Sequence, residues 1–159
     1  MLLTPHTFIG MAIAHFTGSP ILAAPICFVA HFVCDKIPHW DFFSGTENDD
    51  GSRTKGWRFF AFVADFGLAL SIGWFFFYRG AFLQNDLFGA ITLLSGAFFS
   101  NLPDAMESPY IFHMDIYKKS KFLEKFTNLQ KNAQTQAQPI IGITIQLILS
   151  LFSAILLLG

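Results

Sequence analysis

Two histidines and two aspartates lie within eleven residues at the end of a strongly apolar stretch: His31, Asp35, His39 and Asp41. Burying such groups unpaired in hydrocarbon costs on the order of several kcal/mol each, so they need partners. On a helix, residues 31 and 35 lie about 40° apart, so the imidazole and the carboxylate point the same way. Pro38 ends that helix and lets the next two groups fold back toward this face. Histidine with carboxylate is a ligand set for zinc, manganese or iron, and it also forms acid–base pairs.

The elements that must position these groups are apolar, as in a membrane protein. Of the 159 residues, 53% are hydrophobic, 13% are charged and 21 are Phe, a composition that indicates an integral membrane protein. The length is that of a single domain, residues 1–159. The net charge of −1 gives no field that would attract nucleic acid, so no nucleic-acid partner is expected.

The distribution of apolar residues predicts an all-α, polytopic helical bundle of about five apolar helices. The first two form a short hairpin, which either spans or re-enters the membrane, because the first helix is only about 18 Å long against about 30 Å of hydrocarbon. Thr4 is the expected N-cap of the first helix, and residues 44–56 form a polar loop. The five helices are expected at residues 5–16, 20–36, 57–78, 87–101 and 138–158.

Residues 110–136 differ from the rest of the chain and predict an amphipathic helix. Phe122, Phe126 and Leu129 repeat at i, i+4 and i+7, while most of the nearby lysines lie off that stripe. Such a helix is suited to lie on an anionic membrane surface. The alternative is a solvated linker helix.

If the first two helices return the chain to its starting side, nine basic residues lie on that side of the membrane and one lies on the other. Arg79 is then alone on its side of the membrane. By the positive-inside rule, the N-terminus lies on the cytoplasmic side of the cell (inner) membrane and the C-terminus lies outside. The nine residues on the cytoplasmic side are Lys36, Arg53, Lys55, Arg58, Lys118, Lys119, Lys121, Lys125 and Lys131.

This orientation gathers the ionisable groups at one end of the bundle. His31 lies one turn deeper than the others, and Asp65 lies about 12 Å from the cytoplasmic end of its helix, where it could line the same cavity. Asp65 must have a partner in lipid, which could be Arg58 or a histidine. The groups at the helix ends are His6, Asp35, His39, Asp41, Asp104, Glu107 and His113.

We expect one site for one or two divalent metal ions, of which zinc fits best and manganese or iron are alternatives. A spare carboxylate, Asp41 or Glu107, would orient the attacking water. Structural readings compete: a His–carboxylate hydrogen bond between helices, a helix-capping Asp104, or an interfacial loop at residues 39–41. His15 lies on the opposite face from His6 and is expected to serve packing only. The expected metal ligands are His6, His31, Asp35, His39 and Asp104.

Three sequence elements together resemble the YdjM-like family of membrane-bound metal-dependent hydrolases. They are Thr4-Pro-His6-Thr-Phe-Ile-Gly10, His31-x3-Asp35-x2-Pro38-His39-x-Asp41 and Leu102-Pro103-Asp104, and they cover about a third of the chain. The resemblance implies a short polytopic protein with a metal-dependent hydrolase site at its helix ends. Where the family usually has P-D-x-D, this sequence has a histidine in place of the first aspartate. A fainter similarity runs to the zinc-dependent phospholipase C fold.

The sequence therefore predicts a metal-dependent hydrolase that acts on a phosphoester or ester of a lipid-like substrate at the cytoplasmic membrane face. A bound metal ion would lower the pKa of its water toward about 7. Membrane lipids are the expected partners, and the oligomeric state is left open. The alternative is a non-catalytic membrane scaffold or metal-binding protein whose His/Asp cluster is structural. A transporter ranks lowest, because the last helix carries no ionisable group.

Overall fold

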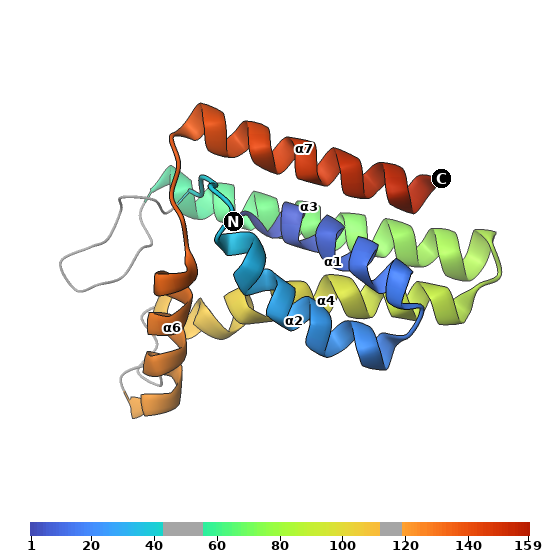
Figure 1. Ribbon diagram of the computed structural model, residues 1–159, viewed down its shortest axis with the longest axis horizontal. Helices are drawn as coiled ribbons and strands as arrows, with labels where there is room; N and C mark the ends of the chain where they lie inside the picture. Colours follow the sequence, from blue (N-terminus) through green and yellow to red (C-terminus); the bar gives the residue numbers. More distant parts are fainter. Residues whose placement is uncertain (43–55, 112–118) are drawn as a thin grey trace.

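The computed structural model describes residues 1–42, 56–111 and 119–159, and within these ranges the protein is all-α. A π-helical turn, η1 (Arg79–Leu83), continues the third helix. The predicted fold class is confirmed at this level, since the described residues contain an isolated β-bridge and no strand. The α-helices are α1 (Leu3–Thr17), α2 (Pro20–Asp35), α3 (Trp57–Tyr78), α4 (Leu87–Ile111), α6 (Lys121–Ala133) and α7 (Pro139–Leu158) (Figure 1).

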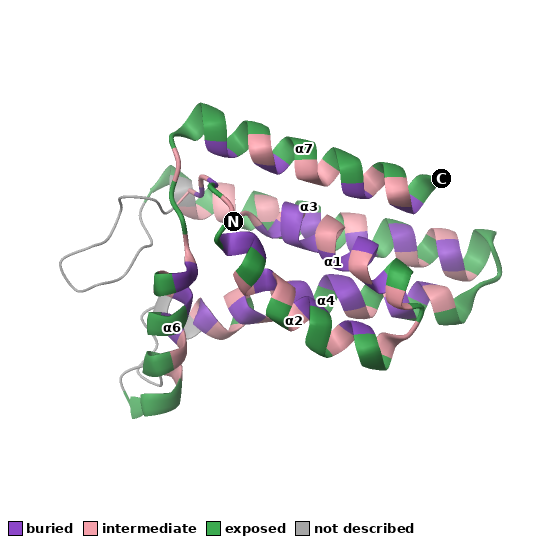
Figure 2. Ribbon diagram, in the orientation of Figure 1, coloured by how far each residue is buried: buried purple, intermediate pink, exposed green. Residues whose placement is uncertain are grey.

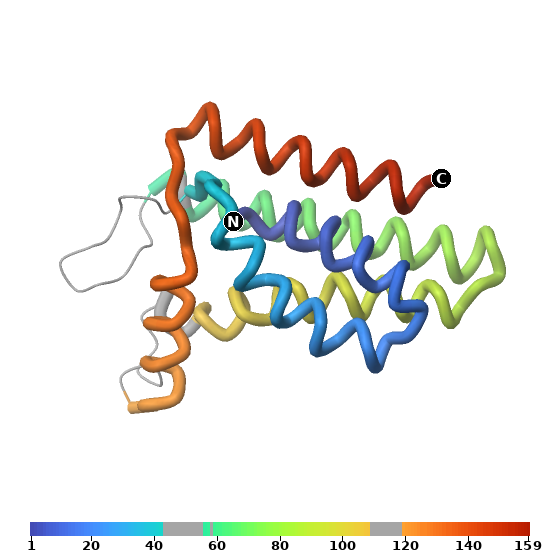
Figure 3. Tube along the Cα trace, viewed as in Figure 1, coloured from blue at the N-terminus to red at the C-terminus, as the bar shows by residue number. Residues whose placement is uncertain are grey.

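Five of the helices run alongside one another, and α6 lies across one end of them (Figure 1). The turn between α1 and α2 and the turn between α3 and α4 lie at the opposite end, near the C-terminus (Figure 3). The N-terminus lies at the α6 end. Each helical hairpin therefore returns the chain to the α6 end, where the sequence places its ionisable groups.

The first hairpin closes as its turn residues predict. Gly18 adopts a left-handed conformation with φ of 61°, which glycine reaches at little cost, and its N–H donates to the carbonyl of Ala14 at 3.0 Å. Pro20 then begins α2, where a missing N–H costs nothing. The hairpin sets α1 and α2 side by side.

Two glycines bring α1 and α4 into close contact. A Cβ added to Gly10 would collide with the carbonyl oxygen of Gly96, and a Cβ added to Gly96 would collide with that of Gly10. Met11, on the next position of α1, is fully buried and packs with Phe76 and Ala97. This contact holds His6, one turn before Gly10, opposite the last part of α4.

Many large apolar side chains are exposed, and Figure 2 shows exposed positions along all of the helices. Among the described residues, two helical stretches are long and apolar enough to cross a membrane, Phe59–Leu83 and Pro139–Leu158, with mean hydropathies of 1.8 and 2.5. Only 17% and 22% of their most apolar windows are buried, unlike the core helix of a water-soluble protein. A bundle with five apolar membrane helices stays a prediction.

Two helix boundaries differ from the prediction. The helix expected at 87–101 continues through Pro103 to Ile111, because proline weakens a helix interior without always ending it. The N-cap of α1 is Leu2 and not Thr4. The capping oxygens come from another helix: Asp65 on α3 accepts hydrogen bonds from the backbone N–H groups of Leu3 and Thr4, at 2.7 and 3.2 Å.

The predicted amphipathic segment 110–136 is helical only in part. Residues 110 and 111 belong to α4, residues 112–118 lie outside the described residues, and α6 occupies Lys121–Ala133. Beyond α6 the chain is extended and pairs with the turn after α2: the N–H of His39 donates to Thr135, and that of Ala137 donates to His39. Nearly all of the predicted polar loop 44–56 lies outside the described residues.

Candidate metal centre

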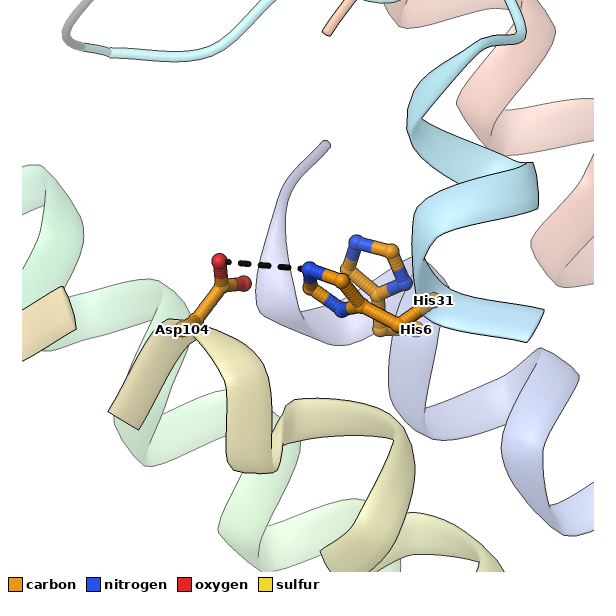
Figure 4. A group of neighbouring side chains, drawn as sticks. All are labelled: His6, His31 and Asp104. Carbon is orange, nitrogen blue, oxygen red and sulfur yellow. Dashed lines mark ion pairs between the residues drawn. The ribbon is translucent and has the colours of Figure 1, made fainter. Parts of the chain in front are cut away.

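Three side chains from three helices converge at the α6 end of the bundle. His6 comes from α1, His31 from α2 and Asp104 from α4 (Figure 4). Each offers one ligand atom, and these three atoms lie within 4.8 Å of one another. The two imidazole rings are stacked, with centroids 4.1 Å apart. This group could hold a metal ion, because histidine nitrogens and a carboxylate oxygen are a common ligand set for divalent metals.

The hydrogen bonds of His31 fix which nitrogen faces the group. Nδ1 lies 2.8 Å from the carbonyl oxygen of Ser100, and because a carbonyl can only accept, Nδ1 carries the proton. Nε2 lies 3.3 Å from Oδ2 of Asp35 and 3.6 Å from Oδ1 of Asp104. A neutral imidazole would therefore direct its lone pair at two carboxylates, an arrangement that a cation or a proton between them stabilises.

Asp35 touches both histidines from the wall of the group. Its Oδ1 atom lies 3.2 Å from Nε2 of His6, and its Oδ2 atom is the one beside His31. In a tetrahedral site with bonds of about 2.0–2.1 Å, ligand atoms lie about 3.3 Å apart, which is close to these separations. The buried α-amino group of Met1 also lies 2.6 Å from Oδ1 of Asp35. Asp35 can thus serve as a ligand or as a charge partner.

Asp104 is the member of the group nearest to open space. Its side chain is 19% exposed, whereas that of His31 is fully covered. Burial raises the pKa of the Asp104 carboxyl to about 6, and the neighbouring imidazole of His31 opposes that rise. The side-chain amide of Gln130 on α6 donates to Oδ1 of Asp104 at 2.6 Å. Gln130 therefore holds the carboxylate in the orientation that faces the histidines.

His39 is buried beside the group but is not one of the three converging residues. Its Nδ1 atom donates to the carbonyl of Ile37 at 2.9 Å, so Nε2 is the unprotonated nitrogen, and the described residues supply no hydrogen-bond partner for it. Burial lowers the pKa of His39, which keeps the imidazole neutral, as a metal ligand must be. Its assignment as a ligand stays a prediction.

Carboxylates line a small cavity next to the group. Asp41, Asp65, Asp104 and Glu107 all face this space of about 50 Å³, which is large enough for water. Asp41 accepts a hydrogen bond from Gln136 at 3.0 Å. The structure thus brings both residues expected to orient water, Asp41 and Glu107, to the same cavity as Asp104.

Of the two remaining histidines, only His15 lies among the described residues, and it is not part of this group. His15 is exposed on α1 and has an edge contact with Phe16. His113 lies outside the described residues. Asp65 lines the cavity as expected, and its carboxylate accepts hydrogen bonds from the backbone amides of Leu3 and Thr4, which begin α1.

Two contributors to the site were missed from the sequence. Gln130 is fully buried, on the face of α6 that also buries Thr127 and Ala133. The predicted apolar stripe gave no signal for it, because Phe122 and Leu129 of that stripe are exposed. The backbone carbonyl of Ser100 carries no signal in the sequence, since every residue has one.

Comparison of the chain with models of protein families, with curated proteins and with solved structures gives no match. The likeness to the YdjM-like hydrolases therefore stays a prediction. The geometry of the group itself is what bears on function.

Proposed function

We propose that the protein is a membrane-embedded, metal-dependent hydrolase that acts on an ester or phosphoester of a lipid-like substrate at the cytoplasmic membrane face. The observation that carries the proposal is the hydrogen bond from Nδ1 of His31 to the carbonyl of Ser100, which turns Nε2 toward Asp35 and Asp104. His6, His31 and Asp104 would hold the ion, and Asp35 would complete the set or balance its charge.

A bound divalent ion would supply Lewis acidity and an acidified water. The chain's own residues would do the rest. The cavity beside Asp104 has room for water, and Asp41 and Glu107 would orient that water and accept its proton. His31 is held by Ser100 and Asp104 by Gln130, so neither must reorganise when the ion binds.

The charge around the small cavity bears on the substrate. Four carboxylates line it, so a free anionic group would be repelled unless bound metal offsets their charge. A neutral carboxylic ester suits this cavity with one ion, and a phosphoester suits it with two. Zinc is the metal that the two histidines favour.

A second candidate is a structural metal site in a membrane scaffold. It is favoured by the position of Asp35, whose two oxygens lie 3.2 Å and 3.3 Å from the two histidines. Four protein ligands would close a tetrahedral shell and leave no position for water.

Metal content and hydrolysis, measured on the same purified protein, test both candidates. We expect the unmodified protein to bind about one or two zinc ions and to hydrolyse a lipid ester or phosphoester only when loaded. His31→Ala should lose the metal, while His15→Ala, an exposed histidine on α1, should keep it. Full metal occupancy in His31→Ala would overturn the metal assignment. Metal binding without hydrolysis of either substrate would favour the scaffold.

A further inference from the structure

A large apolar cavity lies between α3 and α4 and reaches the candidate metal centre. Its volume is about 570 Å³, within the range of small-molecule sites in proteins. Its walls are almost entirely apolar, apart from a few polar residues at one end. The apolar walls include Phe66, Leu70 and Gly73 of α3 and Leu94, Ala97 and Phe98 of α4.

The polar residues mark the end of the cavity that adjoins the metal centre. Thr7, Asn101 and Asp104 line it there, and Asp104 also lines the small carboxylate cavity. The side-chain amide of Asn101 donates to Thr7 at 2.8 Å, while its buried Oδ1 atom has no hydrogen-bond donor among the described residues. Asp104, whose side chain is 19% exposed, is the polar group that a ligand in the cavity would meet, and it belongs to the group that could hold a metal ion.

From this polar end the cavity runs along α3. The lining residues of α3 extend from Phe62 to Gly73, and residues 63–73 rise by about 15 Å. The wall toward the protein interior is made of small side chains: Ala69 and Ala97 are 7% exposed each. The lining residues farthest from the polar end are Gly73 on α3 and Leu94 on α4.

The outer wall of the cavity opens onto apolar surface. Phe66 and Phe98 are 48% and 59% exposed although both line it. The cavity lies along Phe59–Leu83, one of the two stretches apolar enough to cross a membrane. A hydrophobic molecule could therefore enter sideways from the bilayer without crossing water.

We propose that this cavity binds one hydrocarbon chain of a membrane lipid, with the polar linkage of that lipid at Asn101 and Asp104. The occupant follows from the surroundings of the cavity: its open side lies on the exposed apolar face of Phe59–Leu83, and the molecules around a stretch that crosses a membrane are lipid chains. That the bound lipid is a substrate rests on the proposed function, whereas binding of its hydrocarbon chain does not.

Photo-cross-linking on the full-length protein in lipid nanodiscs tests the inference. The probe is a phospholipid with a sixteen-carbon chain that carries a diazirine near its end. We expect cross-links, mapped by mass spectrometry, to concentrate around Gly73 and Leu94. Gly73→Leu should reduce them at least tenfold, because an added Cβ there has room, with Ala97 at 3.8 Å, and the longer side chain fills the cavity. Gly67→Leu, on the same helix with open space around it, should change nothing.

The outcomes separate this inference from the proposed function. His31→Ala should keep the cross-links whether or not it loses metal and hydrolysis. An eight-carbon version of the probe should bind Gly73→Leu as well as it binds the unmodified protein, which also shows that the variant is folded. Cross-links spread evenly over the exposed faces of α3 and α7 in the unmodified protein would overturn the proposal, and so would a Gly73→Leu variant labelled like the unmodified protein.

Discussion

The chemistry of His31 depends on where its Nδ1 proton goes. That proton is held by the carbonyl of Ser100, three residues before Pro103. A proline inside a helix has no N–H to donate to the preceding turn. Ser100 lies in that turn, and its carbonyl accepts the hydrogen bond from His31 of α2. The residue pair Pro103-Asp104 thus does two things: Pro103 leaves the carbonyl one position before Ser100 without its helical N–H donor, and Asp104 presents a carboxylate to Nε2 of the same imidazole.

At the residue scale, the first prediction concerns Gln130. Its amide donates to Asp104 and lies 3.5 Å from Nε2 of His31. Outer hydrogen bonds of this kind are worth about 10–100-fold in metal affinity. We expect Gln130→Ala to weaken zinc binding by at least about tenfold, measured by competition with a chromogenic chelator.

The matched control is Asn132→Ala, an exposed position on the same helix, which should leave zinc affinity unchanged. Equal zinc affinities for Gln130→Ala and the unmodified protein would show that Asp104 needs no support from α6, and α6 would then be unconnected to the site.

Residue type was enough to select His6, His31 and Asp104 from the sequence, within a larger set of expected ligands, because buried charge in an apolar helix is costly and therefore conspicuous. Gln130 was not found, although it contacts His31 across 99 positions of sequence. A neutral amide is less costly to bury than a charge, and nothing local shows which face of α6 packs on the bundle.

At the scale of elements, the contact between α1 and α4 sets the distance between His6 and Asp104. Gly10 and Gly96 let the two backbones touch, and Cys27 on α2 donates to the carbonyl of Gly10 at 3.3 Å. All three helices that carry the group therefore meet one turn away from it. The sequence shows each apolar helix but cannot show this crossing, because close approach depends on which small residues face each other.

Gly10→Ala tests that crossing. The added methyl group would collide with the carbonyl oxygen of Gly96 and with Ser100, and overpacking of this kind costs about 1–3 kcal/mol of unfolding free energy. We expect a lower thermal unfolding midpoint in detergent, followed by circular dichroism, and faster labelling of the buried thiol of Cys27.

Gly67→Ala supplies the comparison, since nothing lies within 4 Å of a Cβ added at that exposed position of α3. It should stabilise the helix by about 0.5–1 kcal/mol through propensity alone. If Gly10→Ala behaved like Gly67→Ala, the two helices would not be in backbone contact and the separation of His6 from Asp104 would need another cause.

Pro103 shows why helix ends were the weakest part of the sequence prediction. Proline and the following aspartate are common signals for a helix end and a new cap, yet α4 continues to Ile111. Asp104 then contacts His31 and Gln130 instead of capping a turn. Local sequence preferences therefore fail to predict a helix end where long-range contacts of the same side chain are more favourable than capping.

At the scale of the whole molecule, the two ends of the bundle differ in their number of basic residues. The candidate metal centre and the lysines of α6 lie at one end, with the N-terminus (Figure 1). At the other end Arg79 donates to the carbonyl of Leu157 at 3.1 Å, at the end of α7, where a cation satisfies a free helix carbonyl. Among the described residues, Arg79 thus has a local structural role, and the lysines of α6 lie at the opposite end. The positive-inside rule counts Lys and Arg and not net charge.

This asymmetry predicts the orientation in the cell membrane, with α6 and the metal centre in the cytoplasm. Gln84→Cys and Lys125→Cys form a matched pair, because both positions are exposed and they lie in the α3–α4 turn and on α6. In intact cells, a membrane-impermeant maleimide should label Gln84→Cys and leave Lys125→Cys unlabelled, and after permeabilisation it should label both. The native Cys27 and Cys34 are buried, and labelling of the unmodified protein at these two thiols defines the background. The reverse pattern would place the site outside the cell, and labelling of both variants in intact cells would mean that the bundle does not separate its two ends across the membrane.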